Sequence, residues 1–119
     1  MNKNPEPNWF LPNLFTLTAQ LKLNHFNGAH KKKENEPFIE IYFSEFADST
    51  GNSLYIKVDK NFENILEGEI FINDINDEFE NANIFLFTEA LVKVLSIING
   101  ESNTNDYRPL SELYPIVSE

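Results

Sequence analysis

The stretch FIEIYFSEFADSTGNSLYIKVD, residues 38–59, decides the fold class. Each half places an apolar side chain at every second position: Ile39, Ile41 and Phe43 in the first half, and Leu54, Ile56 and Val58 in the second. A period of two is typical of a strand with one face on a core and the other in water. The segment between them, Asp48 to Asn52, consists of turn-forming residues. The sequence therefore predicts an antiparallel hairpin here, with its first strand over residues 38–46.

Two further strands are expected on either side of this hairpin. Thr16 to His25 shows the same alternation, and Glu69 to Asn73 is predicted as a short fourth strand after a break at Gly68. Asn27-Gly28 is expected to end the first strand, and residues 29–37 are predicted as a loop that carries three consecutive lysines, Lys31 to Lys33. The connection between the hairpin and Gly68 is left open as either one helical turn or an irregular segment.

One long helix is predicted over residues 77–99. Its apolar stripe has helical spacing and consists of Phe79, Ala82, Leu86, Ala90, Val94 and Ile98. Asn76 or Asp77 is expected as its N-cap and Asn99-Gly100 as its C-cap, and Pro109 is expected to begin a short helix.

Runs of strands followed by a helix favour an α+β fold. We expect a three- to four-stranded antiparallel meander with the long helix packed on one face. Residues 1–119 are expected to form one domain, with an extended arm at 1–12 and a tail at 101–119.

Composition excludes several classes of function. The 119 residues contain no cysteine, which excludes disulfides, thiolate metal sites and cysteine nucleophiles. The net charge of −10 disfavours nucleic acid and anionic membranes as partners and favours cationic ones. No apolar run has the length of a signal peptide or a membrane span, so a cytoplasmic location is expected.

No motif points to catalysis, a metal or a cofactor. His25 is in phase with the apolar positions of the first predicted strand, and His30 lies beside the lysine run. A calcium loop beginning at Asp74 would need glycine at its sixth position and an acid at its twelfth, but Phe79 and Phe85 stand there. We therefore expect no enzyme activity, no catalytic residue, no metal site and no cofactor.

Charge is distributed unevenly along the chain. Residues 1–33 hold five lysines and one glutamate, whereas no basic residue occurs between Lys60 and Lys93. Acidic side chains and one aromatic anchor in that interval form the predicted partner-binding set: Glu63, Glu67, Glu69, Phe71, Asp74, Asp77, Glu78 and Glu80. Acids around apolar anchors suit a basic protein surface, because charge steers the encounter and buried aromatics supply affinity. A merely solvated acidic face is the alternative interpretation.

The aromatic segment Trp9-Phe10-Leu11 is open to two interpretations of its own. It is either a second anchor for a partner or a segment that packs onto the sheet and tethers the N-terminus.

In its small size, acidic and asparagine-rich composition and lack of cysteine, and in the run from Glu63 to Glu80, the chain resembles bacterial toxin-immunity proteins, those of contact-dependent growth inhibition above all. The resemblance implies a protein that binds one cognate toxin domain, often a basic nuclease, and neutralises it. Carboxylates would occupy the place of nucleic-acid phosphates and cover the toxin's active site. The basic run from Lys31 to Lys33 departs from a uniformly acidic surface.

Three other classes stay open. An acidic secretion chaperone would bind an unfolded effector segment, but such chaperones usually begin with an amphipathic helix, and the alternation at 16–25 argues against one. A phage-type inhibitor of a nucleic-acid-binding enzyme would share the acidic block. A small enzyme with an unrecognised carboxylate pair is the third.

Overall fold

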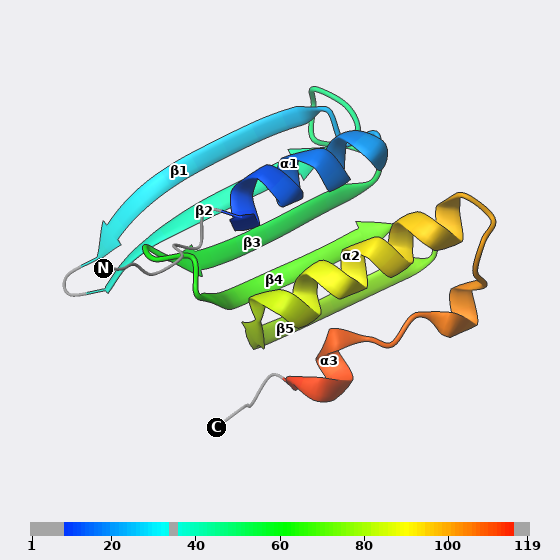
Figure 1. Cartoon of the computed structure of the whole chain (residues 1–119). Helices are drawn as coiled ribbons and strands as arrows, with labels where there is room; N and C mark the ends of the chain where they lie inside the picture. The colour runs from blue at the N-terminus through cyan, green and yellow to red at the C-terminus, as the bar shows by residue number, and fades with distance from the viewer. Residues whose placement is uncertain (1–8, 34–35, 116–119) are drawn as a thin grey trace.

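The structure, a computed structural model, describes residues 9–33 and 36–115. It is an α+β fold, as predicted, with five strands rather than three or four (Figure 1). The elements in chain order are α1 (Phe10–Gln20), β1 (His25–Lys33), β2 (Glu36–Ser44), β3 (Ser53–Asp59), β4 (Asn64–Ile72), β5 (Ile75–Asn83), α2 (Ile84–Ile98), the 3-10 helix η2 (Thr104–Asp106) and α3 (Leu110–Leu113).

The five strands form one antiparallel sheet in the order β1-β2-β3-β4-β5. Each strand pairs with its neighbour in sequence, so the sheet is the predicted meander. The predicted hairpin is present, since Ile41 lies opposite Ile56 and the turn residues 48–52 lie in the loop between β2 and β3. The β4–β5 connection is a two-residue turn at Asn73-Asp74, where Asn73 has a φ of 53°. Asn tolerates that left-handed conformation better than most residues, which suits a tight hairpin.

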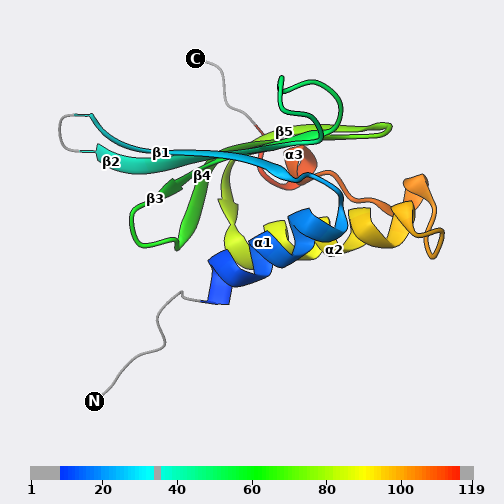
Figure 2. The same cartoon turned by 90° about the horizontal axis from the view of Figure 1, so that it is seen from above.

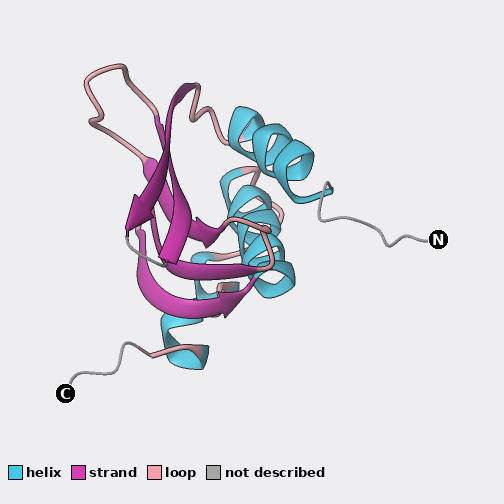
Figure 3. Ribbon diagram, turned by 90° about the vertical axis from the view of Figure 1, so that its left-hand side faces the viewer, coloured by secondary structure: helices cyan, strands magenta, loops and turns pink. Residues whose placement is uncertain are grey.

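Two helices, α1 of 11 residues and α2 of 15, lie on the same side of the sheet, where one long helix was expected. Figure 2 shows α1 and α2 beneath it, and Figure 3 shows the loop at 45–52 projecting on the opposite side. The core fills the space between the helices and the sheet, where Phe10 of α1, Phe79 of β5 and Phe87 of α2 are all buried. The Phe87 ring joins the other two, with centroid separations of 6.3 Å to Phe10 and 5.9 Å to Phe79. Among the described residues, no helix is both long and apolar enough to cross a membrane.

The predicted first strand at 16–25 is wrong, because residues 10–20 form α1. The buried residues of that helix are Phe10, Leu14 and Thr18, a spacing of four, and Leu21 continues the stripe just beyond its end. Pro12 is compatible with this helix. It occupies the third position of the helix, where the backbone has no N–H bond to lose. The objection to a chaperone, which rested on this strand, falls with it.

The predicted helix start is also wrong, because residues 75–83 form β5 and α2 begins only at Ile84. Asn83 is the N-cap, and its side-chain Oδ1 accepts hydrogen bonds from the backbone N–H groups of Phe85 and Leu86. Asn81 has a φ of 58°. Because of this irregularity, the core-facing Phe79 and Ala82 lie three positions apart instead of two. That spacing is typical of a helix, although both residues belong to a strand.

Most of the predicted loop at 29–37 is strand, since residues 29–33 belong to β1 and residues 36–37 to β2, while residues 34–35 lie outside what the structure describes. Asn27 and Gly28 lie within β1 opposite Tyr42 and Ile41, and the lysine run continues β1 as far as Lys33. The side chains of residues 29–37 lie outside what the structure describes, as do residues 1–8 of the predicted arm and 116–119 of the tail. The short helix predicted after Pro109 is present as α3.

Candidate partner-binding face

The face of the sheet that points away from α1 and α2 is called the open face here. Strand alternation places on it the side chains that alternate with the buried ones. On β2 to β5 they include Glu40, Tyr42 and Ser44 of β2, Ser53, Tyr55 and Lys57 of β3, Glu67, Glu69 and Phe71 of β4, and Asn76, Glu78 and Glu80 of β5. No helix in the described part of the chain covers this face (Figure 2).

Strand register arranges these side chains in three rows across the sheet. The first row runs Glu40, Lys57, Glu67, Glu80, the second runs Asn27, Tyr42, Tyr55, Glu69, Glu78, and the third runs His25, Ser44, Ser53, Phe71, Asn76. In the first two rows the β4–β5 end carries only glutamates. Among the side chains that the structure describes, the open face therefore has an acidic half over β4 and β5 and a mostly neutral, aromatic half over β1 to β3.

The acidic half contains two cross-strand pairs of like charge. Glu67 lies opposite Glu80, and Glu69 lies opposite Glu78. Directly opposed like charges destabilise an antiparallel pair of strands. A shallow hollow of about 190 Å³ opens among these four glutamates and Tyr55. This is the densest negative charge that the described strands bring together.

Lys57 is the basic residue of the open face among the side chains that the structure describes. Its Nζ lies 3.7 Å from a carboxylate oxygen of Glu67 and 4.3 Å from the ring centroid of Phe38. Both side chains of the ion pair are partly exposed, so the pair adds little stability. Its position leaves the Glu69–Glu78 pair without an ion-pair partner among the described residues.

Tyr55 contacts both an acid and a second ring in the aromatic part of the open face. Its hydroxyl donates a hydrogen bond of 3.0 Å to Glu40, and its ring lies 4.6 Å from that of Tyr42. Burial raises the pKa of Tyr55 well above its ordinary value, and the hydrogen bond to Glu40 and the charges of Glu40 and Glu67 raise it further. The hydroxyl is therefore a fixed, protonated donor at neutral pH. The Tyr42 ring is 52% exposed and is available for contact.

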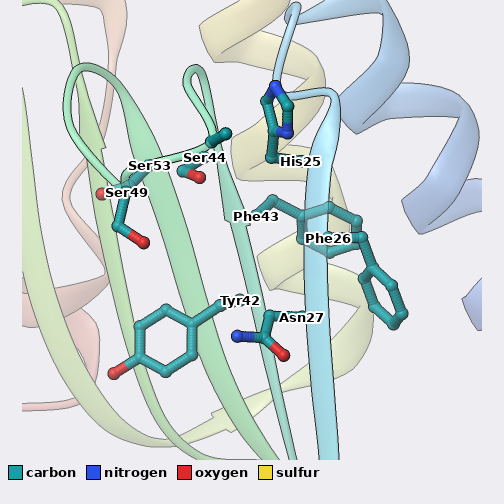
Figure 4. A pocket seen from close by; sticks show the side chains of 9 residues that line it. His25, Phe26, Asn27, Tyr42, Phe43, Ser44, Ser49 and Ser53 are labelled. Atoms are coloured by element: carbon teal, nitrogen blue, oxygen red, sulfur yellow. The ribbon is translucent and has the colours of Figure 1, made fainter.

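A second hollow, of about 370 Å³, lies at the neutral end of the open face (Figure 4). Its polar lining comes from His25, Asn27, Tyr42, Ser44, Ser49 and Ser53. None of these side chains is a carboxylate or a lysine. The two hollows therefore differ in charge although they share one face.

Five of the eight predicted site residues meet on the open face: Glu67, Glu69, Phe71, Glu78 and Glu80. Asp74 is exposed in the β4–β5 turn, and Glu63 is exposed in the loop before β4. Phe71 is 44% exposed, as an aromatic anchor would need to be.

Asp77 lies on the opposite face of the sheet and is 2% exposed. Its carboxylate accepts hydrogen bonds from the Tyr107 hydroxyl at 2.6 Å, the Leu110 N–H at 2.7 Å and the Ser111 N–H at 3.0 Å. Burial, together with the hydrogen bond to Asp77, raises the pKa of Tyr107 well above its ordinary value. Asp77 thus fastens α3 to the sheet, and it is neither a helix cap at residue 77 nor accessible to a partner.

Sequence reasoning did not include Glu40, Tyr42 and Tyr55 in the site. Alternation placed them on the outward side of their strands, but only the pairing of β2 with β3 and of β3 with β4 brings them beside Glu69. The aromatic segment at residues 9–11 packs within the protein, since Phe10 is buried and the Trp9 ring stacks on Phe85 at 4.9 Å.

No group of three or more His, Cys, Asp or Glu side chains within the described residues is arranged to hold a metal ion. No family model, no curated protein and no solved structure matches the chain.

Proposed function

We propose that the protein binds a basic protein partner through the acidic half of its open face. The observation that carries this proposal is the two pairs of opposed glutamates, Glu67 with Glu80 and Glu69 with Glu78. Each pair costs stability in the free protein, and a lysine or arginine placed between the two carboxylates would reverse that cost. The arrangement is therefore more favourable in a complex with a cationic surface than in the free chain.

Aromatic side chains beside the glutamates supply the remaining requirements of an interface. Phe71 and Tyr42 are about half exposed and lie on the same face as the four carboxylates. Affinity in protein complexes comes mainly from a few desolvated aromatic or arginine anchors, while surrounding charges raise the association rate. We infer that the glutamates direct the encounter and that these rings hold the partner.

The resemblance to toxin-immunity proteins supplies the class of partner. On this proposal the partner is a basic toxin domain, for example a nuclease, and binding neutralises it. A nuclease binds phosphates through lysine and arginine side chains, and the same side chains would bind the acidic half of the open face. The partner would then be blocked by occupation of its substrate-binding surface, with no chemistry performed by this protein.

A secretion chaperone is the second candidate, and α1 is the observation that favours it. The chain has an N-terminal helix, Phe10–Gln20, where the sequence predicted a strand. The two functions differ in the state of the partner. An immunity protein binds a folded domain, whereas a chaperone binds an unfolded segment.

The test uses the protein encoded immediately upstream of this gene, with its C-terminal domain as the probe. Association is followed by stopped-flow fluorescence at several salt concentrations, with the probe folded and with the probe denatured. The reversal variant carries Glu67→Lys, Glu69→Lys, Glu78→Lys and Glu80→Lys. We expect its association rate to fall on the order of 100-fold and its salt dependence to weaken.

A matched control has the same change in net charge at exposed acids outside the open face. It carries Glu89→Lys, Glu101→Lys, Asp106→Lys and Glu112→Lys. Its association rate should fall only a few-fold. Equal losses in both variants would show that only net charge matters and would contradict the proposal. Binding of the denatured probe alone would favour the chaperone.

A further inference from the structure

The outer surface of the helical layer carries very little charge. None of the 11 residues of α1 is Asp, Glu, Lys or Arg, and the 15 residues of α2 contain only Glu89 and Lys93. Exposed surfaces of small domains are usually about a quarter to a third charged. This protein has 28 charged residues in 119, so the deficit belongs to the helices and not to the chain as a whole.

Apolar side chains project from this layer into solvent. Val92 is 51% exposed, and Phe85, stacked on Trp9, is 59% exposed. The outward positions of α1 include Thr16 and Ala19, which are exposed and short. The helices run side by side in the same direction, since Trp9 contacts Phe85 at one end and a hollow at the other end is lined from both helices. Together they present a surface on which Glu89 and Lys93 are the only charged side chains of the two helices.

We propose that a second copy of this chain packs on the outer surface of α1 and α2. Two copies with a net charge of −10 repel one another wherever their acidic surfaces meet. An arrangement that brings the acidic halves of two open faces together would oppose acids to acids. The helical layer is the described surface on which a like-charged copy meets almost no repulsion.

The two charged residues of the layer are complementary under a two-fold axis. Glu89 and Lys93 are four positions apart and lie on one side of α2. In a two-fold interface, a contact between Glu89 of one copy and Lys93 of the other occurs twice. Pairing through α2 therefore matches each charge with its opposite and covers Val92 and Phe85.

The area of the helical layer limits the surface that the dimer buries and therefore its affinity. A helix of 15 residues is about 22 Å long and each helix is about 10 Å wide, so the two helices offer about 400 Å² per copy. Stable complexes bury about 800 Å² per partner, so this dimer is weak and depends on concentration. Both open faces point outward from it, so the dimer neither requires nor prevents the proposed function.

Sedimentation equilibrium of the full 119-residue chain tests the proposal directly. Over about 5 to 500 µM, which covers weak association, we expect the average mass to rise from that of one copy, 13.8 kDa, toward twice that value. Val92→Glu should raise the dissociation constant at least about tenfold. The matched control is Phe71→Glu, which places the same charge at a similarly exposed apolar site on the open face and should leave the dissociation constant unchanged.

A charge exchange provides a second test that does not depend on Val92. Glu89→Lys and Lys93→Glu should each weaken the dimer, and the double variant should restore it to within about threefold of the original dissociation constant. A single-copy mass across the whole range would overturn the proposal. So would a dimer that Val92→Glu leaves unchanged, or one that Phe71→Glu disrupts.

Discussion

Two neighbouring acids, Asp77 and Glu78, lie on opposite faces of the sheet and have opposite effects on stability. Asp77 points toward the helical side, is buried and accepts three hydrogen bonds. Glu78, the next residue, points to the open face and lies opposite another glutamate. One carboxylate therefore stabilises the fold and the other weakens it. The comparison teaches that the acidic run from Glu63 to Glu80 has no single role, because strand alternation divides it between structure and surface.

The largest expected effect on stability comes from removing the stabilising carboxylate, that of Asp77. Asp77→Ala should lower the free energy of unfolding by about 3 kcal/mol, because it leaves the Tyr107 hydroxyl and two backbone N–H groups without an acceptor in a buried site. Urea denaturation measures the loss. Glu78→Ala is the control one residue away, and it should change stability by less than about 0.5 kcal/mol. Equal losses would mean that Asp77 does not fasten α3.

A second expected effect compares two glycines that lie beneath aromatic rings. A Cβ at Gly68 would meet the ring of Phe79, which is buried and has no room to move. A Cβ at Gly28 would meet the ring of Phe26, which is 52% exposed and so has solvent on one side.

Gly68→Ala should therefore cost about 2 kcal/mol of stability, the usual scale of overpacking in a core. Gly28→Ala should cost less than half of that. Thermal or urea unfolding distinguishes the two variants, and a larger loss for Gly28→Ala would contradict the packing described for β4.

The smallest expected effect on stability concerns Glu78, the carboxylate that weakens the fold. Glu78→Gln removes the repulsion with Glu69 while keeping the shape of the side chain, so it should raise the free energy of unfolding by about 0.5 kcal/mol. The gain should shrink at about 0.5 M salt, where exposed charges are screened. Glu101→Gln, at an exposed acid without an opposed carboxylate, is the control and should be neutral. A loss of stability in Glu78→Gln would show that Glu78 already has a cationic partner in the free protein.

Local sequence patterns predicted the strands that lie within the sheet better than the elements around them. The alternation at 38–46 and 54–58 corresponds to β2 and β3, because each of these strands has one face on the core. The alternation at 16–25 was misleading. Leu21 and Leu23 follow the end of α1, and tertiary packing buries both of them. Because they are two positions apart, they continue a period-two pattern that begins inside the helix.

The candidate site was predictable in charge but not in geometry. The absence of basic residues between Lys60 and Lys93 is visible in the sequence, and it located four of the glutamates that share the open face. It could not separate Asp77 from them, because the sequence predicts a helix from residue 77. The irregularity at Asn81 places Phe79 and Ala82 three positions apart, and that spacing fits a helix as well as it fits the strand.

The sequence by itself determined an acidic, cysteine-free α+β chain built around one antiparallel hairpin, because composition and side-chain period are properties of neighbouring residues. Only the tertiary structure decided which acids face each other and which is buried. The register between β4 and β5 sets the two glutamate pairs, and the packing of α3 against β5 gives Asp77 its partners. Those contacts join residues up to 34 positions apart, a separation over which local periodicity carries no information.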